Sequence, residues 1–178
     1  LVRRFREGKL VGGSLWAVRW RADELEPLDP RTLGRGQRYP TETETTGWEE
    51  TTVLAAGLLA WEPALAAAFA RAVLPHNPVL AARCLLEVPP RPTRYQWPPF
   101  APVLEAVAKD TRAALLARLT DRGADRRARL GAGFALGELG DPRFPVERTP
   151  DGVAYIAPHW IPIPGGTFTM GSADDDPE

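Results

Sequence analysis

The side chains that could carry out chemistry are few in this sequence and lie far apart along it. Cys84 is the only cysteine, and an isolated thiol among apolar neighbours is typical of a buried core residue. His76 and His159 each lie beside a proline and lack the close spacing of metal-ligating histidines. The acidic run at 174–176 lacks the glycine and the spacing of an EF-hand loop, so we interpret it as a solvated or disordered end. The sequence therefore predicts no catalytic residue, no metal site and no cofactor within this chain.

A cluster of arginines stands where a helix is expected to begin. Asp125 is a candidate N-cap, and Arg126, Arg127 and Arg129 follow it directly. Because basic side chains oppose the positive end of a helix dipole, we expect these arginines to have partners. Local carboxylates on a solvated face are favoured over nucleic acid or phosphate as those partners. Arg126 and Arg127 are retained as candidate partner-binding residues.

A proline-rich stretch at 88–99 carries the side chains most typical of a binding hot spot. Its prolines are too dense for a helix or a central strand and indicate an extended crossover. Arg94, Tyr95 and Trp97 combine guanidinium and aromatic groups, so they are candidate contacts for a protein partner or a neighbouring domain. The alternative, slightly favoured, is that Tyr95 and Trp97 only cover the edges of helices.

Composition limits the class of protein. The chain has 178 residues, 22 Lys and Arg against 23 Asp and Glu, and 44% hydrophobic residues, which is typical of a globular protein. A disulfide scaffold and a disordered chain are excluded on these grounds. No apolar run approaches the roughly 20 residues that a membrane span needs, and residues 1–20 lack the features of a signal peptide. We expect a cytoplasmic protein that does not bind membranes. Because the chain starts at Leu1 and stops soon after an apparent new strand, we interpret it as an internal fragment.

The elements that would position these side chains are mainly helical. Residues 1–46 are expected to be an irregular segment in which Leu15–Arg21 forms a short strand or a helix edge, with Trp16 and Trp20 anchoring a core. Residues 47–143 are expected to be an α-helical region, because Ala- and Leu-rich blocks alternate there with Pro and Gly. Asn77 before Pro78 is a good N-cap, and Arg118 is assigned to the solvated face of its helix. The expected helices span about 48–60, 63–74, 77–86, 100–120 and 125–139.

The stretch from Arg129 to Arg143 resembles the end of a HEAT-type repeat helix. Gly131, Ala135 and Gly137 are small enough to let adjacent helices approach, and Leu136 and Leu139 would fill the interface. Gly140-Asp141-Pro142 then ends the helix. This is the single well-preserved copy of the signature, so an irregular helical bundle with one repeat-like helix stays open as the alternative.

The C-terminal part, 144–178, has the pattern of a linker followed by β structure. Val153–Ile156 and the run at 160–172 are expected to form two short β segments, with Asp151-Gly152 as a tight turn. Pro164-Gly165-Gly166 would supply the left-handed backbone positions of a hairpin or bulge.

The same run at 160–172 resembles the opening strand of a formylglycine-generating-enzyme/sulfatase-modifying-factor domain. The residues that carry this resemblance are Pro164, Gly165, Gly166, Phe168, Met170, Gly171 and Ser172. The resemblance implies a larger domain with a variant of the C-type lectin fold, which would continue beyond Glu178. Family members with enzyme activity use a copper-bound pair of cysteines that lies far downstream, and Cys84 does not correspond to either of them.

A helical array followed by such a domain is similar to the C-terminal halves of bacterial STAND proteins of the NACHT type. The resemblance implies a non-catalytic scaffold and sensor segment that recognises a protein or a ligand of unknown identity. Any nucleotidase or oxidase activity would lie outside residues 1–178, since the chain has no Walker A motif. Two alternatives stay open: an accessory part of a formylglycine-generating-enzyme-like copper oxidase, and the stalk of a lectin-like ligand-display protein.

Overall fold

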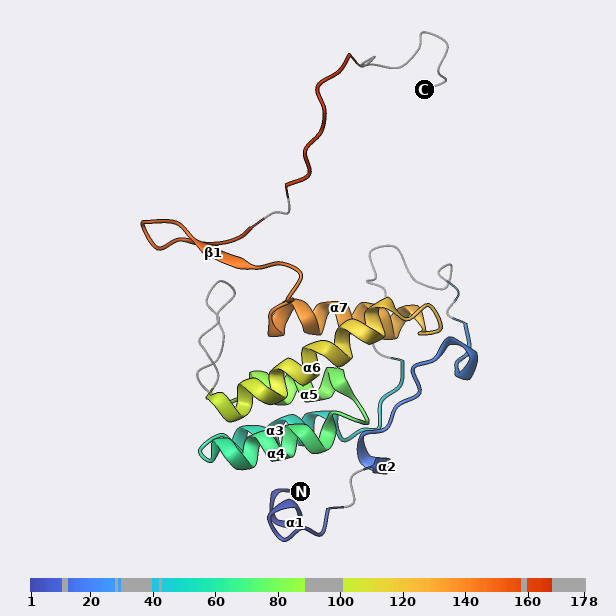
Figure 1. Cartoon of the computed structure of the whole chain (residues 1–178). Helices are drawn as coiled ribbons and strands as arrows, with labels where there is room; N and C mark the ends of the chain where they lie inside the picture. The colour runs from blue at the N-terminus through green and yellow to red at the C-terminus, as the bar shows by residue number, and fades with distance from the viewer. Residues whose placement is uncertain are drawn as a thin grey trace.

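The computed structural model describes residues 1–10, 13–27, 29, 40–41, 43–88, 101–157 and 160–167. Over these residues the chain is mainly helical, with a small antiparallel sheet of two strands near the C-terminus (Figure 1). Within the described part of the chain, no helix combines the length and the apolar character that crossing a lipid bilayer requires. The elements in chain order are α1 (Val2–Arg6), α2 (Gly13–Trp16), the 3-10 turn η1 (Ala22–Glu24), α3 (Glu49–Leu59), α4 (Pro63–Val73), α5 (Pro78–Leu86), α6 (Pro102–Thr120), α7 (Arg126–Leu139), β1 (Val146–Arg148) and β2 (Ala154–Ile156).

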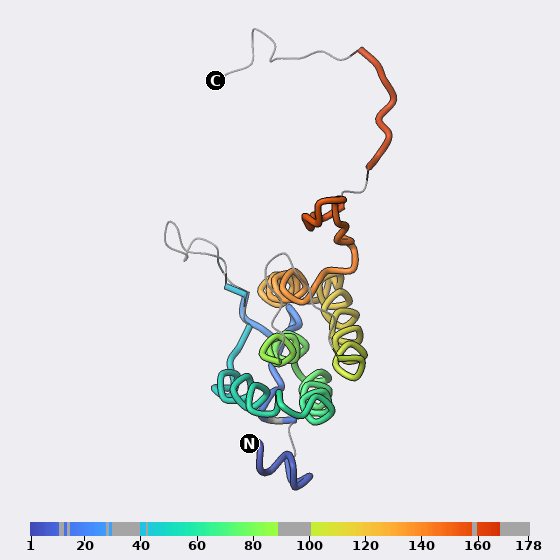
Figure 2. Tube along the Cα trace, turned by 90° about the vertical axis from the view of Figure 1, so that its left-hand side faces the viewer, coloured from blue at the N-terminus to red at the C-terminus, as the bar shows by residue number. Residues whose placement is uncertain are grey.

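Helices α3 to α7 form a stack of two files, which Figure 2 shows nearly end-on. In one file α5 contacts both α3 and α7, and in the other file α4 contacts α6. Successive helices also pack across the files, and α6 packs most extensively against α7. Each helix is therefore covered by the helices before and after it, and α7 is the last of the series.

The predicted apolar faces of these helices form one core. Phe69 of α4 and Leu85 of α5 are fully buried, and the predicted place of Cys84 on the apolar side of its helix is confirmed. The α6 face is also confirmed, with buried side chains at Leu104, Val107, Ala108, Thr111 and Leu115. The boundaries follow from local chemistry, because a proline stands in the first turn of α4, α5 and α6, where its missing N–H is not needed.

The predicted N-cap of α5 is confirmed. The Oδ1 atom of Asn77 accepts a hydrogen bond from the backbone N–H of Leu80 at 3.1 Å, and the Asn77 side chain is buried. Replacing Asn77 by alanine leaves that N–H without its partner, so we expect the free energy of unfolding to fall by about 1 kcal/mol in urea titrations. Asn77→Asp retains an acceptor and is the control. Equal stability of the alanine and wild-type proteins would contradict the assignment.

The N-terminal region contains two limbs that run along the side of the stack. Residues 15–21 ascend towards α7 and residues 43–46 return to α3 (Figure 1). Side chains join the limbs: Thr43 donates to the carbonyl of Arg19, and Thr46 donates to the carbonyl of Leu15 at 2.7 Å. Leu15–Arg21 was expected to form a short strand or a helix edge. The strand is wrong, because these side-chain bonds take the place of a backbone ladder, and Leu15 and Trp16 lie instead in α2. The ascending limb forms one isolated antiparallel β-bridge among the described residues, between Arg21 and Ala124.

The two tryptophans of the ascending limb have different roles. Trp16 anchors the core as expected, with 2% of its surface exposed and its ring edge-on to Phe69 at 5.9 Å. Trp20 is half-buried, and the guanidinium of Arg118 lies 4.6 Å from its ring centre. Arg118 was assigned to the solvated face, and this is wrong: burial lowers its pKa to about 10. The aromatic ring holds the cation against the protein.

Helix α7 differs from expectation at its glycines. A Cβ at Gly131 would lie 2.3 Å from the carbonyl oxygen of Thr41, so this glycine admits the N-terminal backbone rather than a neighbouring helix. Gly137 has nothing within 4 Å of its Cβ position, so its expected role in close helix packing is wrong. Leu136 and Leu139 are buried as predicted. Gly140, with φ of 92°, ends the helix.

The β structure is a hairpin in which β1 pairs with β2. Val146 faces Ile156 and Arg148 faces Ala154, and Gly152 closes the turn with φ of 86°. The tight turn and the segment at Val153–Ile156 are confirmed, and the partner strand is Val146–Arg148, which was not predicted. Residues 160–167 contain no strand, are exposed throughout, and include two prolines that cannot donate to a ladder. Neither Gly165 nor Gly166 takes the left-handed conformation expected of it.

Candidate interaction surface

An apolar hollow of about 710 Å³ opens on the outer side of α7. Leu119 comes from the end of α6, and Leu130, Gly133 and Phe134 come from α7. Phe134 is 62% exposed and Leu130 is 38% exposed, although the opposite side of the same helix is buried. Large apolar side chains gathered at one place on a surface are typical of a site that binds another molecule.

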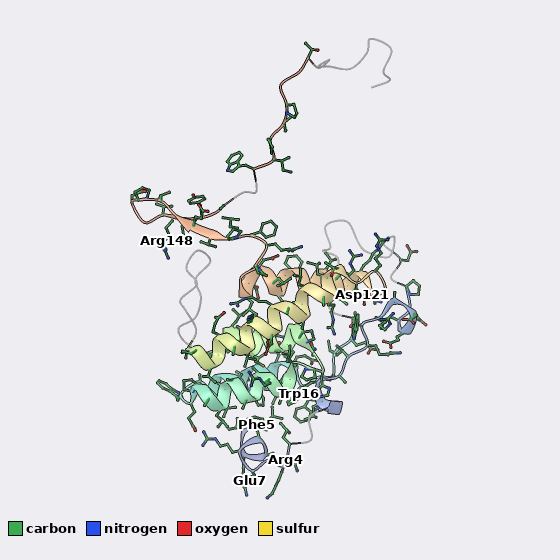
Figure 3. All side chains as sticks on the ribbon, viewed as in Figure 1. Arg4, Phe5, Glu7, Trp16, Asp121 and Arg148 are labelled. Atoms are coloured by element: carbon green, nitrogen blue, oxygen red, sulfur yellow. The ribbon has the colours of Figure 1, made fainter. Side chains whose placement is uncertain are left out.

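A second hollow, of about 620 Å³, continues this surface towards the hairpin. Gly133 lines both hollows, and Gly137 and Gly140 extend the second one along the helix. The hairpin side contributes Phe144, Val146, Ala154, Tyr155 and Ile156, together with the ion pair of Asp141 and Arg143. The outer face of α7 therefore carries one apolar surface from its first turns to the hairpin, and Figure 3 shows the side chains over these elements. We call this surface the α7 groove.

Arginines stand at the end of the α7 groove where the helix begins. Arg126 and Arg129 line the first hollow, and together with Arg122 they line a third, more polar hollow of about 440 Å³. Arg129 donates to the carbonyl of Leu119 at 3.0 Å. Among the residues that the structure describes, none of these arginines forms an ion pair with a carboxylate. Asp125 also lines the third hollow, but it is paired with Arg127 at 2.8 Å. This end of the groove therefore carries a net positive charge, and the N-terminus of α7 adds to that charge.

Arg127 is held within the chain. Its Nε lies 2.8 Å from Oδ1 of Asp125, and its Nη2 donates to the carbonyl of Glu26 at 2.9 Å. The side-chain bond from Arg127 holds the pKa of Asp125 below its usual range, and Asp125 also caps α7 by accepting the N–H of Arg127 at 2.8 Å. The expectation that first-turn arginines have local carboxylate partners is thus met at Arg127, which positions the helix end.

The other candidate residues do not gather at this surface. Arg94, Tyr95, Trp97, Phe168, Met170, Gly171 and Ser172 lie outside the described residues, as do His159 and 174–176. Pro164, Gly165 and Gly166 are exposed. Leu130 and Phe134 are exposed and were not predicted as surface residues. A signal was present, because Leu130 and Phe134 stand four positions apart on a different side of the helix from Leu136 and Leu139.

The described residues contain no group of three or more His, Cys, Asp or Glu side chains placed to hold a metal ion. Cys84 is fully buried, and its thiol lies 4.0 Å from the carbonyl oxygen of Thr52. Burial raises the pKa of Cys84 to about 12.

The raised pKa of Cys84 leads to a prediction. The native thiol is both covered and protonated at pH 8, so we expect an aromatic disulfide reagent to label it only at the rate at which the protein opens. Unfolding in urea should restore the rate of an ordinary cysteine. The same shift predicts that this residue's contribution to stability is complete below about pH 9 and declines as the pH rises towards 12. Immediate labelling of the native protein would contradict the burial.

Comparisons with protein-family models, with curated protein sequences and with solved structures return no match for this chain.

Proposed function

We propose that the chain is a non-catalytic scaffold and sensor segment of a larger signalling or defence protein of the STAND, NACHT-like type, and that it acts by protein recognition. The observation that carries the proposal is the α7 groove, an exposed apolar surface at the end of a helical stack. A surface of this kind suits the docking of another protein element.

The arrangement of the helices supports the HEAT-like part of the proposal. In HEAT-type arrays, pairs of helices stack so that each contacts its neighbours, which is the pattern of the two files from α3 to α7. Buried Leu136 and Leu139, and the stop at Gly140, are the features of the repeat-like signature that α7 retains. The formylglycine-generating-enzyme-like part rests on the sequence at 164–172 alone.

Reading the native open reading frame in both directions tests the proposed function. We expect a Walker A motif upstream, and a downstream domain without a closely spaced pair of cysteines. Absence of a Walker A motif together with a paired-cysteine site downstream would overturn the proposal. In that case the helical region would be an accessory part of a copper oxidase. A cysteine-free downstream domain without any upstream nucleotidase would instead favour the stalk of a lectin-like display protein.

A further inference from the structure

The α7 groove combines a long apolar lining with a positive charge at the end where α7 begins. Its apolar part runs from Leu130 and Phe134 to Ile156 of the hairpin. Arg122, Arg126 and Arg129 lie at the end where α7 begins, whereas Arg143 at the hairpin end is ion-paired with Asp141 at 2.6 Å. Within the stack, α5 and α6 cover the inner sides of α7. The hairpin borders the outer side at one end, and α5 and α6 are the described helices that pack extensively on α7.

The groove has the dimensions of a helix. Helix α7 has 14 residues and is therefore about 21 Å long. Gly133 and Gly137 are one turn apart and face the groove, so a second backbone can approach α7 closely between the apolar ends. An amphipathic helix of about four turns, with apolar residues at i, i+3, i+4 and i+7, would cover the apolar part.

The arginines at the end of the α7 groove determine which charge a bound helix must carry. Arg122, Arg126 and Arg129 form no ion pair with a carboxylate among the described residues, and they surround the end of the groove at the positive end of the α7 dipole. Carboxylates over these guanidinium groups would form charge-assisted hydrogen bonds. A basic occupant would meet like charges.

A nucleic acid would make favourable contacts with only part of this surface. Phosphates would pair with the arginines, but they would leave Phe134, Phe144 and Ile156 exposed to water. The apolar lining continues from the arginines along α7 to the hairpin. The observations therefore favour a protein segment over a nucleic acid.

We propose that the α7 groove binds an amphipathic helix of a partner protein, with acidic residues at the end of that helix that lies over Arg122, Arg126 and Arg129. The proposal rests on the proposed function in one respect, that the chain acts by protein recognition. It adds the chemical class of the partner and the place where the partner binds.

Two synthetic peptides of about 16 residues, long enough to span the groove, test the proposal with the full chain. Both carry the same leucine stripe, but the polar positions of the terminal turns are Glu in one and Lys in the other. Fluorescence anisotropy of labelled peptides at about 50 mM NaCl, where charges are weakly screened, measures both affinities. We expect the acidic peptide to bind at least about tenfold more tightly, and added salt to reduce that preference.

Variants of the groove separate the two contributions. In R126E/R129E we expect the preference to reverse in favour of the basic peptide. In Phe134→Gln we expect both peptides to lose about tenfold or more in affinity, in the range seen for hot-spot truncation. The matched controls are Arg71→Glu on the exposed side of α4 and Leu58→Gln on α3, where the side chain is 69% exposed. Both controls should bind like the wild type, and circular dichroism verifies that each variant is folded.

Three results would overturn the proposal: no binding of either peptide, equal binding of both, or an unchanged preference in R126E/R129E. Competition by a single-stranded oligonucleotide that is insensitive to Phe134→Gln would assign the arginines to nucleic acid instead. Peptide binding and the reading frame are independent measurements. A groove that binds the acidic peptide in a protein without an upstream nucleotidase retains this inference and overturns the signalling role. An upstream nucleotidase together with a groove that binds neither peptide would retain the signalling role and overturn this inference.

Discussion

Replacing Trp16 by alanine is expected to lower the free energy of unfolding by about 3–5 kcal/mol, the range for removal of a large aromatic side chain from a core. The indole is 2% exposed and stands edge-on to Phe69 at 5.9 Å. Its Nε1–H donates to Oγ1 of Thr52 at 3.0 Å, and that hydroxyl in turn donates to the carbonyl of Trp48 at 2.7 Å. The variant loses apolar contacts and also leaves part of this buried chain unpaired.

Urea denaturation followed by circular dichroism measures the effect of Trp16→Ala. Trp61→Ala is the matched control, because Trp61 is 93% exposed and its removal should change stability by less than about 0.5 kcal/mol. Thr52→Val removes the acceptor at nearly constant volume and should cost about 1 kcal/mol, the net value of one hydrogen bond. A Trp16 variant no less stable than the Trp61 variant would show that the N-terminal region does not pack on the helices as described.

The second large effect comes from two glycine substitutions on α7, which we expect to change the free energy of unfolding in opposite directions. Gly131→Ala places a methyl group 2.3 Å from the carbonyl oxygen of Thr41, a backbone atom that moves only with its whole limb. We expect a loss of about 1–3 kcal/mol, the usual cost of overpacking. Gly137→Ala adds the same methyl group in open space on the same helix. Because alanine is the better helix former, we expect a gain of about 0.5–1 kcal/mol.

Thermal and urea unfolding of the two glycine variants give this comparison directly, and each is the control for the other. Helix propensity contributes equally to both, so the difference between them reports the contact with Thr41. If both variants gain stability by similar amounts, then the limb at residues 40–41 does not lie against α7.

The helices were predictable because their signals are local. Asn77 with Pro78, Pro63, and Asp125 mark helix starts by chemistry within one turn. The apolar faces follow from residues three and four positions apart, as at Leu104, Val107, Thr111 and Leu115. The tight turn at Gly152 belongs to the same class, because it depends on one residue that takes a positive φ readily.

The features that the sequence did not predict depend on contacts between distant segments. Arg118 lies over Trp20, and Thr41 lies against Gly131, and neither pair has a local signal. The strand partner of Val153–Ile156 was not predicted, because Val146–Arg148 is short and exposed, with no alternation strong enough to identify it. The candidate interaction surface was half-predicted: Arg126 was chosen for its charge, whereas Phe134 becomes a surface residue only through the way α7 packs.

The two N-terminal limbs have a consequence for how the molecule unfolds. A stack of helices with contacts only between neighbours can open from either end, one unit at a time. Here Trp16 is bonded to α3, and a few residues later the carbonyl of Trp20 accepts the N–H of Asp125 at the start of α7. The returning limb presses Thr41 against Gly131 before it leads back into α3. The first and last layers are thereby coupled, so local opening at one end must disrupt the other, and the array gains the all-or-none cooperativity of a single globular unit.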